Sequence, residues 1–191
     1  MADDHNHIPK IFHSYDTGQP FDHCKVCGRN LLDGQTRYFI EKAVNQYKGL
    51  KKSDVVFEYA ICMPCYEEIN QTMSEESKKN IQEYFTHHVN LLARNQLLMG
   101  GVRPDIDHWL SHCVITHTPR NDTEQYQIVG LFQGNRIVYE TMPMMISMEA
   151  IDEMANLLSN KTLDGLNDFM DNILDLPPEL KDLFKDKPVL I

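Results

Sequence analysis

Two cysteine pairs, each with the spacing C-x-x-C, constrain this chain more than any other feature of its sequence. The first pair is Cys24 and Cys27, the second is Cys62 and Cys65, and residues 28–61 lie between them. Such a turn directs two thiolates at one ion, and two turns supply the four ligands of a tetrahedral Zn²⁺ site. Because four thiolates leave no position for water, the pattern predicts one structural zinc ion rather than a catalytic one.

Two other chemistries use the same residue types. Paired cysteines also form thioredoxin-type redox sites, but such a site uses a single pair in a βαβ context, which neither pair has. Four cysteines can also hold an iron–sulfur cluster. His23, which precedes Cys24, is an alternative ligand, although the four cysteines already complete a site. Zinc is the interpretation that the two pairs together favour, and the others stay open.

The segments around the cysteines follow a defined order. Gly28 suits a tight turn with a positive φ directly after the first pair. Residues 36–44 and 54–61 are rich in β-branched and aromatic residues and predict a hairpin. Pro64 and the acidic residues after it predict a helix that starts at the second pair. This order resembles a treble-clef zinc finger over residues 21–72, which implies a zinc-binding hairpin and helix there and nothing about the remaining chain.

The rest of the chain alternates helical and strand patterns. Apolar residues spaced three and four apart between Ser74 and Leu98 predict one long helix that ends at Gly100. After it, residues 114–116, 125–132 and 136–140 predict strands, the last two forming a hairpin, and two or three helices follow. The fold class is therefore α+β. We expect four segments: an arm over residues 1–20, a zinc finger over 21–72, a long central helix over 73–101 and an α+β unit over 102–191.

Charge is unevenly distributed along the chain. The formal net charge is −10 at pH 7, which argues against a protein that coats nucleic acid or an anionic membrane with its whole surface. Residues 24–66 are nevertheless net basic, whereas residues 121–191 are strongly acidic. The basic side chains of this segment either are simply hydrated at the tip of a hairpin or contact a partner. Contacts with phosphates would dominate any affinity for nucleic acid. The candidate contact residues are Lys25, Arg29, Lys48, Lys51 and Lys52.

The sequence also bears on compartment. No apolar run approaches the roughly 18 residues that cross a bilayer. The N-terminus carries Asp3 and Asp4 and lacks the apolar stretch of a secretory signal. Cysteines that stay reduced are typical of a reducing compartment. We expect a cytoplasmic protein with no membrane partner.

A second group of residues could carry chemistry. His108 and His112 have the i, i+4 spacing of metal ligands, and Cys113 with His117 offers a nucleophile and a base. On a helix, however, the two histidines lie opposite the apolar face that contains Trp109 and Cys113. The histidines are then expected to be exposed and the thiol to be buried and inert.

These patterns favour a zinc-stabilised, non-enzymatic interaction or regulatory protein whose partner is a protein. One alternative is a nucleic-acid-associated regulator that binds through the basic finger. Another is an enzyme with a site at residues 108–117, although the chain has no phosphate-binding Gly-rich loop, no G-x-S-x-G and no H-E-x-x-H. The oligomeric state, including a homo-oligomer, stays open.

Overall fold

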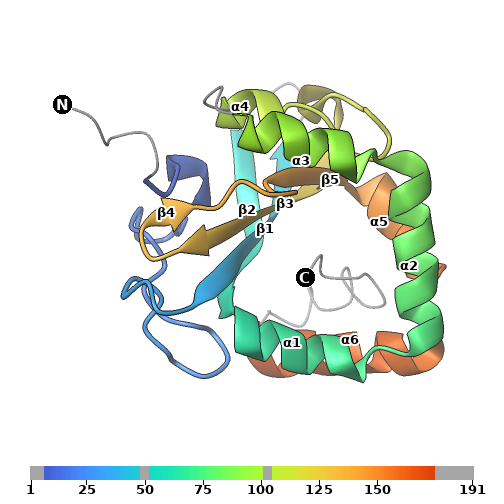
Figure 1. Ribbon diagram of the computed structural model, residues 1–191, viewed down its shortest axis with the longest axis horizontal. Helices are drawn as coiled ribbons and strands as arrows, with labels where there is room; N and C mark the ends of the chain where they lie inside the picture. The colour runs from blue at the N-terminus through green and yellow to red at the C-terminus, as the bar shows by residue number, and fades with distance from the viewer. Residues whose placement is uncertain (1–6, 48–51, 101–104, 175–191) are drawn as a thin grey trace.

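An antiparallel sheet of five strands forms the centre of an α+β fold (Figure 1). The computed structural model describes residues 7–47, 52–100 and 105–174. The strand order is β2-β1-β3-β4, and β5 also pairs with β3. The hairpin beside the cysteines therefore shares one sheet with the C-terminal strands. The strands are β1 (Arg37–Tyr47), β2 (Lys52–Cys62), β3 (Gln125–Gln133), β4 (Arg136–Ile137) and β5 (Met144–Ser147).

Besides the five strands, the described residues form six helices and two 3₁₀ turns. In Figure 1, α1 and α6 lie side by side, α2 leads from them towards α3, and α5 follows β5. The helices are α1 (Met63–Thr72), α2 (Glu75–His88), α3 (Leu91–Met99), α4 (Ile106–Trp109), α5 (Met148–Ala155) and α6 (Asn160–Ile173), and the 3₁₀ turns are η1 (Lys10–Phe12) and η2 (Arg120–Asp122).

The two faces of the sheet are covered by different parts of the chain. On one face, the ring of Tyr59 packs edge-on against Phe169 of α6, with centroids 5.7 Å apart. On the other face, Phe12 packs against Phe132, with centroids 5.1 Å apart. Gly130 permits this contact, because a Cβ there would lie within about 3.0 Å of both rings. Residues expected in an arm thus contribute to the core, while the segment boundaries expected at 20, 72 and 101 stay predictions.

The single long helix predicted over residues 73–101 is wrong. The chain forms α2 and α3 instead, and Val89 between them has extended backbone with φ −126° and ψ 119°. Asn90 caps α3, because its Oδ1 accepts the amide of Ala93 at 3.0 Å. A capping asparagine after a β-branched residue favours a new helix over continuation of the old one. The apolar spacing continued across this break and concealed it.

Three further expectations need correction. Residues 114–116 form a turn, closed by the amide of His117 on the carbonyl of Cys113 at 3.0 Å, and His117 has a φ of 59°. The predicted hairpin exists, but its second strand is only the short β4. Strand β5 was not predicted, because its methionine-rich sequence has little β propensity. Of the two or three helices predicted after these strands, the third, which Pro177 and Pro178 would begin, lies outside the described residues.

The N-termini of α2 and α6 cap each other through four hydroxyl groups. Ser74 Oγ accepts the amide of Ser77 at 3.1 Å, and Ser159 Oγ accepts the amide of Thr162 at 3.3 Å. The amide of Ser74 donates to Thr162 Oγ1 at 3.0 Å, and the amide of Ser159 donates to Ser77 Oγ at 2.9 Å. Each capping residue is therefore held by the other helix. Ser159 is thus fixed as the N-cap of α6 by a residue of α2.

Replacement of Ser77 by alanine is expected to lower the free energy of unfolding by about 1–2 kcal/mol. Ser77 is fully buried, and its loss leaves the amide of Ser159 without an acceptor. Urea denaturation followed by circular dichroism measures the change. Ser53→Ala, at an exposed position on β2, is the matched control and should shift the free energy by less than about 0.5 kcal/mol. Equal effects of the two variants would contradict the role of the hydroxyl group.

Candidate metal centre

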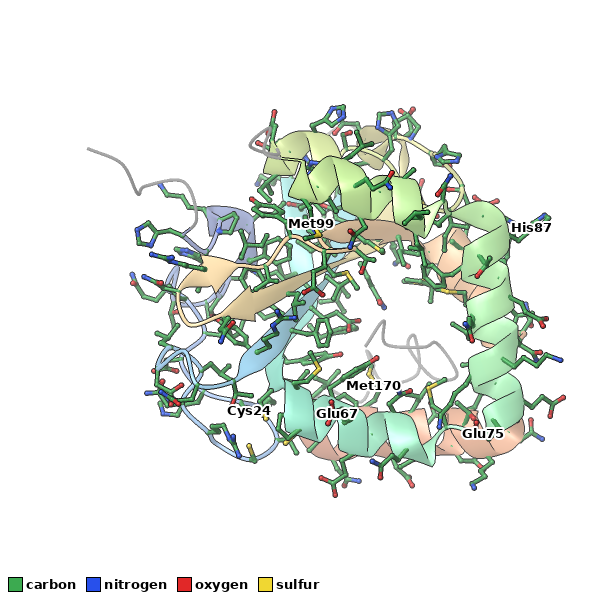
Figure 2. The ribbon with its side chains drawn as sticks, in the orientation of Figure 1. Cys24, Glu67, Glu75, His87, Met99 and Met170 are labelled. Carbon is green, nitrogen blue, oxygen red and sulfur yellow. The ribbon has the colours of Figure 1, made fainter. Side chains whose placement is uncertain are left out.

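The sulfur atoms of Cys24, Cys27, Cys62 and Cys65 converge. All four Sγ atoms lie within 4.8 Å of one another, and the Sγ atoms of Cys27 and Cys62 are 3.7 Å apart. A tetrahedral ion with Zn–S bonds of ~2.3 Å holds its sulfurs about 3.8 Å apart. The cluster is thus able to hold one metal ion such as Zn²⁺. Figure 2 shows Cys24 in the loop beside the start of α1.

The first pair lies on a tight turn. The amide of Cys24 donates to the carbonyl of Arg29 at 2.8 Å, and the amide of Gly28 donates to the carbonyl of Cys24 at 2.9 Å. Gly28 has a φ of 69°, which confirms the left-handed turn predicted after the first pair. The amide of Lys25 donates to the carbonyl of Ala60 at 2.8 Å. This bond ties the turn to the end of β2, where the second pair begins.

The second pair joins a strand to a helix. Cys62 is the last residue of β2 and the N-cap of α1, and Cys65 lies in the first turn of that helix. Pro64 occupies one of the first two helical positions, which confirms the predicted start of the helix. The amide of Cys62 donates to Cys24 Sγ at 3.3 Å. Amide donors and the positive end of a helix both favour thiolate ligands at this position.

Burial makes the cluster depend on a cation. Cys24, Cys62 and Cys65 are buried, and only Cys27 is exposed. The backbone near Arg29 donates to Cys27 and lowers the pKa of that thiol to about 7. Burial raises the pKa of the Cys62 and Cys65 thiols above the ordinary value. Several thiolates cannot share such a site unless a positive ion compensates their charge, and a coordinated ion deprotonates its thiols outright.

The sulfur distances also bear on the other two chemistries. A disulfide requires sulfur atoms about 2.05 Å apart, whereas all five cysteines are unpaired here. An iron–sulfur cluster distributes its cysteines over several iron atoms, which spreads the sulfurs more widely than one ion does. His23 is exposed and pairs with Asp22 at 2.9 Å, and it is not part of the cluster. The geometry therefore favours four sulfur ligands around a single ion.

The candidate contact residues do not form one surface. Lys25 and Arg29 are exposed on the turn of the first pair. Lys52 begins β2, whereas Cys62 ends it, and a strand of that length spans roughly 33 Å at ~3.3 Å per residue. Lys48 and Lys51 lie outside the described residues. The described basic residues are thus divided between opposite ends of the hairpin.

The second candidate group does come together. His108, His112, Cys113 and His117 line one hollow of about 350 Å³, together with His88 of α2. His108 and His112 are exposed and Cys113 is fully buried, as expected, and His117 is exposed as well. However, α4 ends at Trp109 and does not carry His112.

The thiol of Cys113 is held by hydrogen-bond donors rather than by a base. Burial acts to raise its pKa, but the amide and hydroxyl of Ser147 and the amide of Thr116, at 3.3–3.4 Å, outweigh that effect and lower the pKa. Among the described residues, no histidine ring bonds to this sulfur. Serine and threonine donors, and not a histidine, are the hydrogen-bond partners of this sulfur.

Comparison with protein-family models, curated proteins and solved structures finds no match. Among the described residues, no helix is both long and apolar enough to cross a membrane. In the same residues, the four cysteines are the one group of three or more ligand-type side chains with metal-binding geometry.

Proposed function

We propose that the protein binds one Zn²⁺ ion through Cys24, Cys27, Cys62 and Cys65, and that the ion stabilises a non-enzymatic interaction or regulatory protein. The observation that carries this proposal is the approach of four sulfur atoms to within 4.8 Å. Four thiolates complete the preferred coordination of zinc and leave no position for a reacting water. The role of the ion is then structural.

The arrangement of elements supports a treble-clef-like finger over residues 21–72. The turn of the first pair, the β1–β2 hairpin and α1 follow one another in the order that the resemblance implies. One ion would join the turn, the end of β2 and the first turn of α1. Such a finger keeps reduced cysteines, which suits a reducing compartment such as the cytoplasm.

A protein is the partner that the surface favours. Three side chains of α3 are largely exposed, namely Leu92 at 70%, Leu97 at 66% and Met99 at 64%. Exposed apolar side chains gathered on one element are typical of surfaces that contact another protein or a second copy of the chain. The division of Lys52 from Lys25 and Arg29 weakens the alternative of a nucleic-acid contact through the finger.

Metal analysis of the purified chain tests the proposal. We expect about one zinc per chain and no stoichiometric iron or acid-labile sulfide. Removal of the ion with a strong chelator should lower the midpoint of thermal unfolding, because metal binding and folding are coupled. Stoichiometric iron with sulfide, or a chain that folds equally well without metal, would contradict the structural zinc.

A further inference from the structure

One large cavity lies on the sheet face that Phe12 also covers, and none of the four clustered cysteines lines it. Its volume is about 1070 Å³, against about 440 and 350 Å³ for two others. Its floor includes Lys42, Val44 and Ile128 from β1 and β3, and its walls include Tyr15 of the N-terminal segment and Arg120 of the turn η2. Sites for small organic ligands have volumes of roughly 300–1,000 Å³, so this cavity can admit one.

The charge of the lining is opposite to that of the chain. Among the described residues, four basic residues and no acidic residue line the cavity, although the whole chain has a net charge of −10. Glu58 balances Lys42, because its carboxylate lies 2.9 Å from Lys42 Nζ. Lys10 and Lys52 make no ion pair within the described residues. The described residues therefore leave positive charge at the cavity without a counter-charge, and an anionic ligand would be attracted to it.

Arg120 borders the cavity and also has a buried donor beside it. Its Nη2 lies 3.9 Å from the exposed carboxylate of Asp107, which is the limit of an ion pair. Its Nη1 is buried and has no hydrogen-bond acceptor among the described residues. A guanidinium suits a phosphate or carboxylate, to which it can donate parallel hydrogen bonds. The amide of Arg120 donates to the carbonyl of Ser111 at 2.7 Å, which fixes the residue at the cavity.

The rest of the lining suits a flat organic body. Val44, Val55 and Ile128 give it an apolar floor. Tyrosine rings also border the cavity, and their faces stack well on planar groups. Three side-chain amides supply both donors and acceptors for the edge of a ring or for a sugar. The tyrosines are Tyr15, Tyr47 and Tyr126, and the amides are Gln19, Gln46 and Asn121.

We propose that this cavity binds a free nucleoside monophosphate, with Arg120 and Lys52 at the phosphate and the tyrosine rings at the base. A nucleotide combines the two properties that the lining selects, a compact anion and a flat ring with polar edges. A single nucleotide suits the site better than a nucleic acid, because the net charge of −10 repels a long polyanion. This site is independent of the zinc proposal, since no cysteine lines the cavity.

Isothermal titration calorimetry of the metal-loaded full chain with AMP, GMP, CMP and UMP tests the proposal. We expect one molecule of nucleotide per chain for at least one of the four. Inorganic phosphate carries only the anion of the ligand, and adenosine carries only its nucleoside. If AMP is the preferred nucleotide, each of these two should bind at least about tenfold more weakly than AMP. Arg120→Ala and Lys52→Ala should each raise the Kd about tenfold or more, because each removes a charged partner of the phosphate.

Matched variants distinguish the loss of a cavity residue from a general change in the net charge of the protein. Arg37→Ala and Lys79→Ala remove an arginine and a lysine from exposed ion pairs that do not line the cavity, and they should leave the Kd unchanged. Lys52 is exposed, so its variant tests the site even if Arg120→Ala fails to fold. Absence of binding by all four nucleotides at millimolar concentration would overturn the proposal, as would an unchanged Kd in the Lys52 variant. Tighter binding of a short single-stranded RNA than of any mononucleotide would overturn the assignment to a free nucleotide.

Discussion

Cys62→Ser is expected to release the bound metal and to lower the free energy of unfolding by about 4 kcal/mol or more. Cys62 ends β2, caps α1 and donates its amide to Cys24 Sγ, so it connects three parts of the site. A serine hydroxyl stays protonated at neutral pH and does not replace a thiolate ligand. The variant also leaves three buried or crowded thiols without the cation that permits their ionisation.

Metal content and stability should change together in this variant. Elemental analysis gives the zinc content, and urea denaturation gives the free energy of unfolding. Cys113→Ser is the matched control, because Cys113 is equally buried but stands outside the four-sulfur cluster. The control should keep about one zinc per chain. Full zinc occupancy in Cys62→Ser would show that the four-cysteine assignment is incorrect.

The metal centre could be predicted because its signals are local. Cys24 and Cys27 are three residues apart, and so are Cys62 and Cys65, and a short turn brings each pair together whatever the rest of the chain does. The hairpin between the pairs is formed by strands close in sequence, and it is confirmed by the pairing of β1 with β2. Local propensity and turn chemistry are enough for such elements.

Contacts between distant segments could not be predicted in this way. The central pairing of β1 with β3 places Tyr38 opposite Phe132, and no local pattern specifies that register. Phe12 packs on Phe132, which is also far from it in sequence. No local pattern indicates this contact, so the sequence predicted an arm for these residues. The cavity is formed by those same long-range contacts, and the grouping of Arg120 with Lys52 was therefore invisible in the sequence.

The break between α2 and α3 has a different origin. A short-range signal existed, since Asn90 is a strong N-cap residue and follows the β-branched Val89. The apolar spacing through Leu98 pointed to one helix and outweighed that signal. In the same way, assigning His108 and His112 to one helical face assumed a helix through residue 113, but α4 ends at Trp109 because Leu110 begins a turn. Helix ends are set by single capping residues, which periodicity does not detect.

Glu58→Ala is expected to lower the free energy of unfolding by about 3 kcal/mol, because it leaves a buried ammonium group without its counter-charge. The side chains of Lys42 and Glu58 are only 5% and 13% exposed, and the carboxylate lies 2.9 Å from Nζ. The same carboxylate accepts the amide of Tyr15 at 2.7 and 3.0 Å, and Lys42 Nζ also donates to the carbonyl of His13. The pair therefore holds the N-terminal segment on the sheet.

The prediction separates loss of a buried pair from loss of surface charge. Glu83→Ala breaks an exposed pair with Lys79, whose charged atoms are 3.8 Å apart, and should cost less than about 0.5 kcal/mol in urea denaturation. Adding Lys42→Met to Glu58→Ala removes the uncompensated charge and should restore part of the lost stability. If Glu58→Ala were as mild as Glu83→Ala, the ion pair would not hold the N-terminal segment, and other contacts such as the packing of Phe12 on Phe132 would hold it.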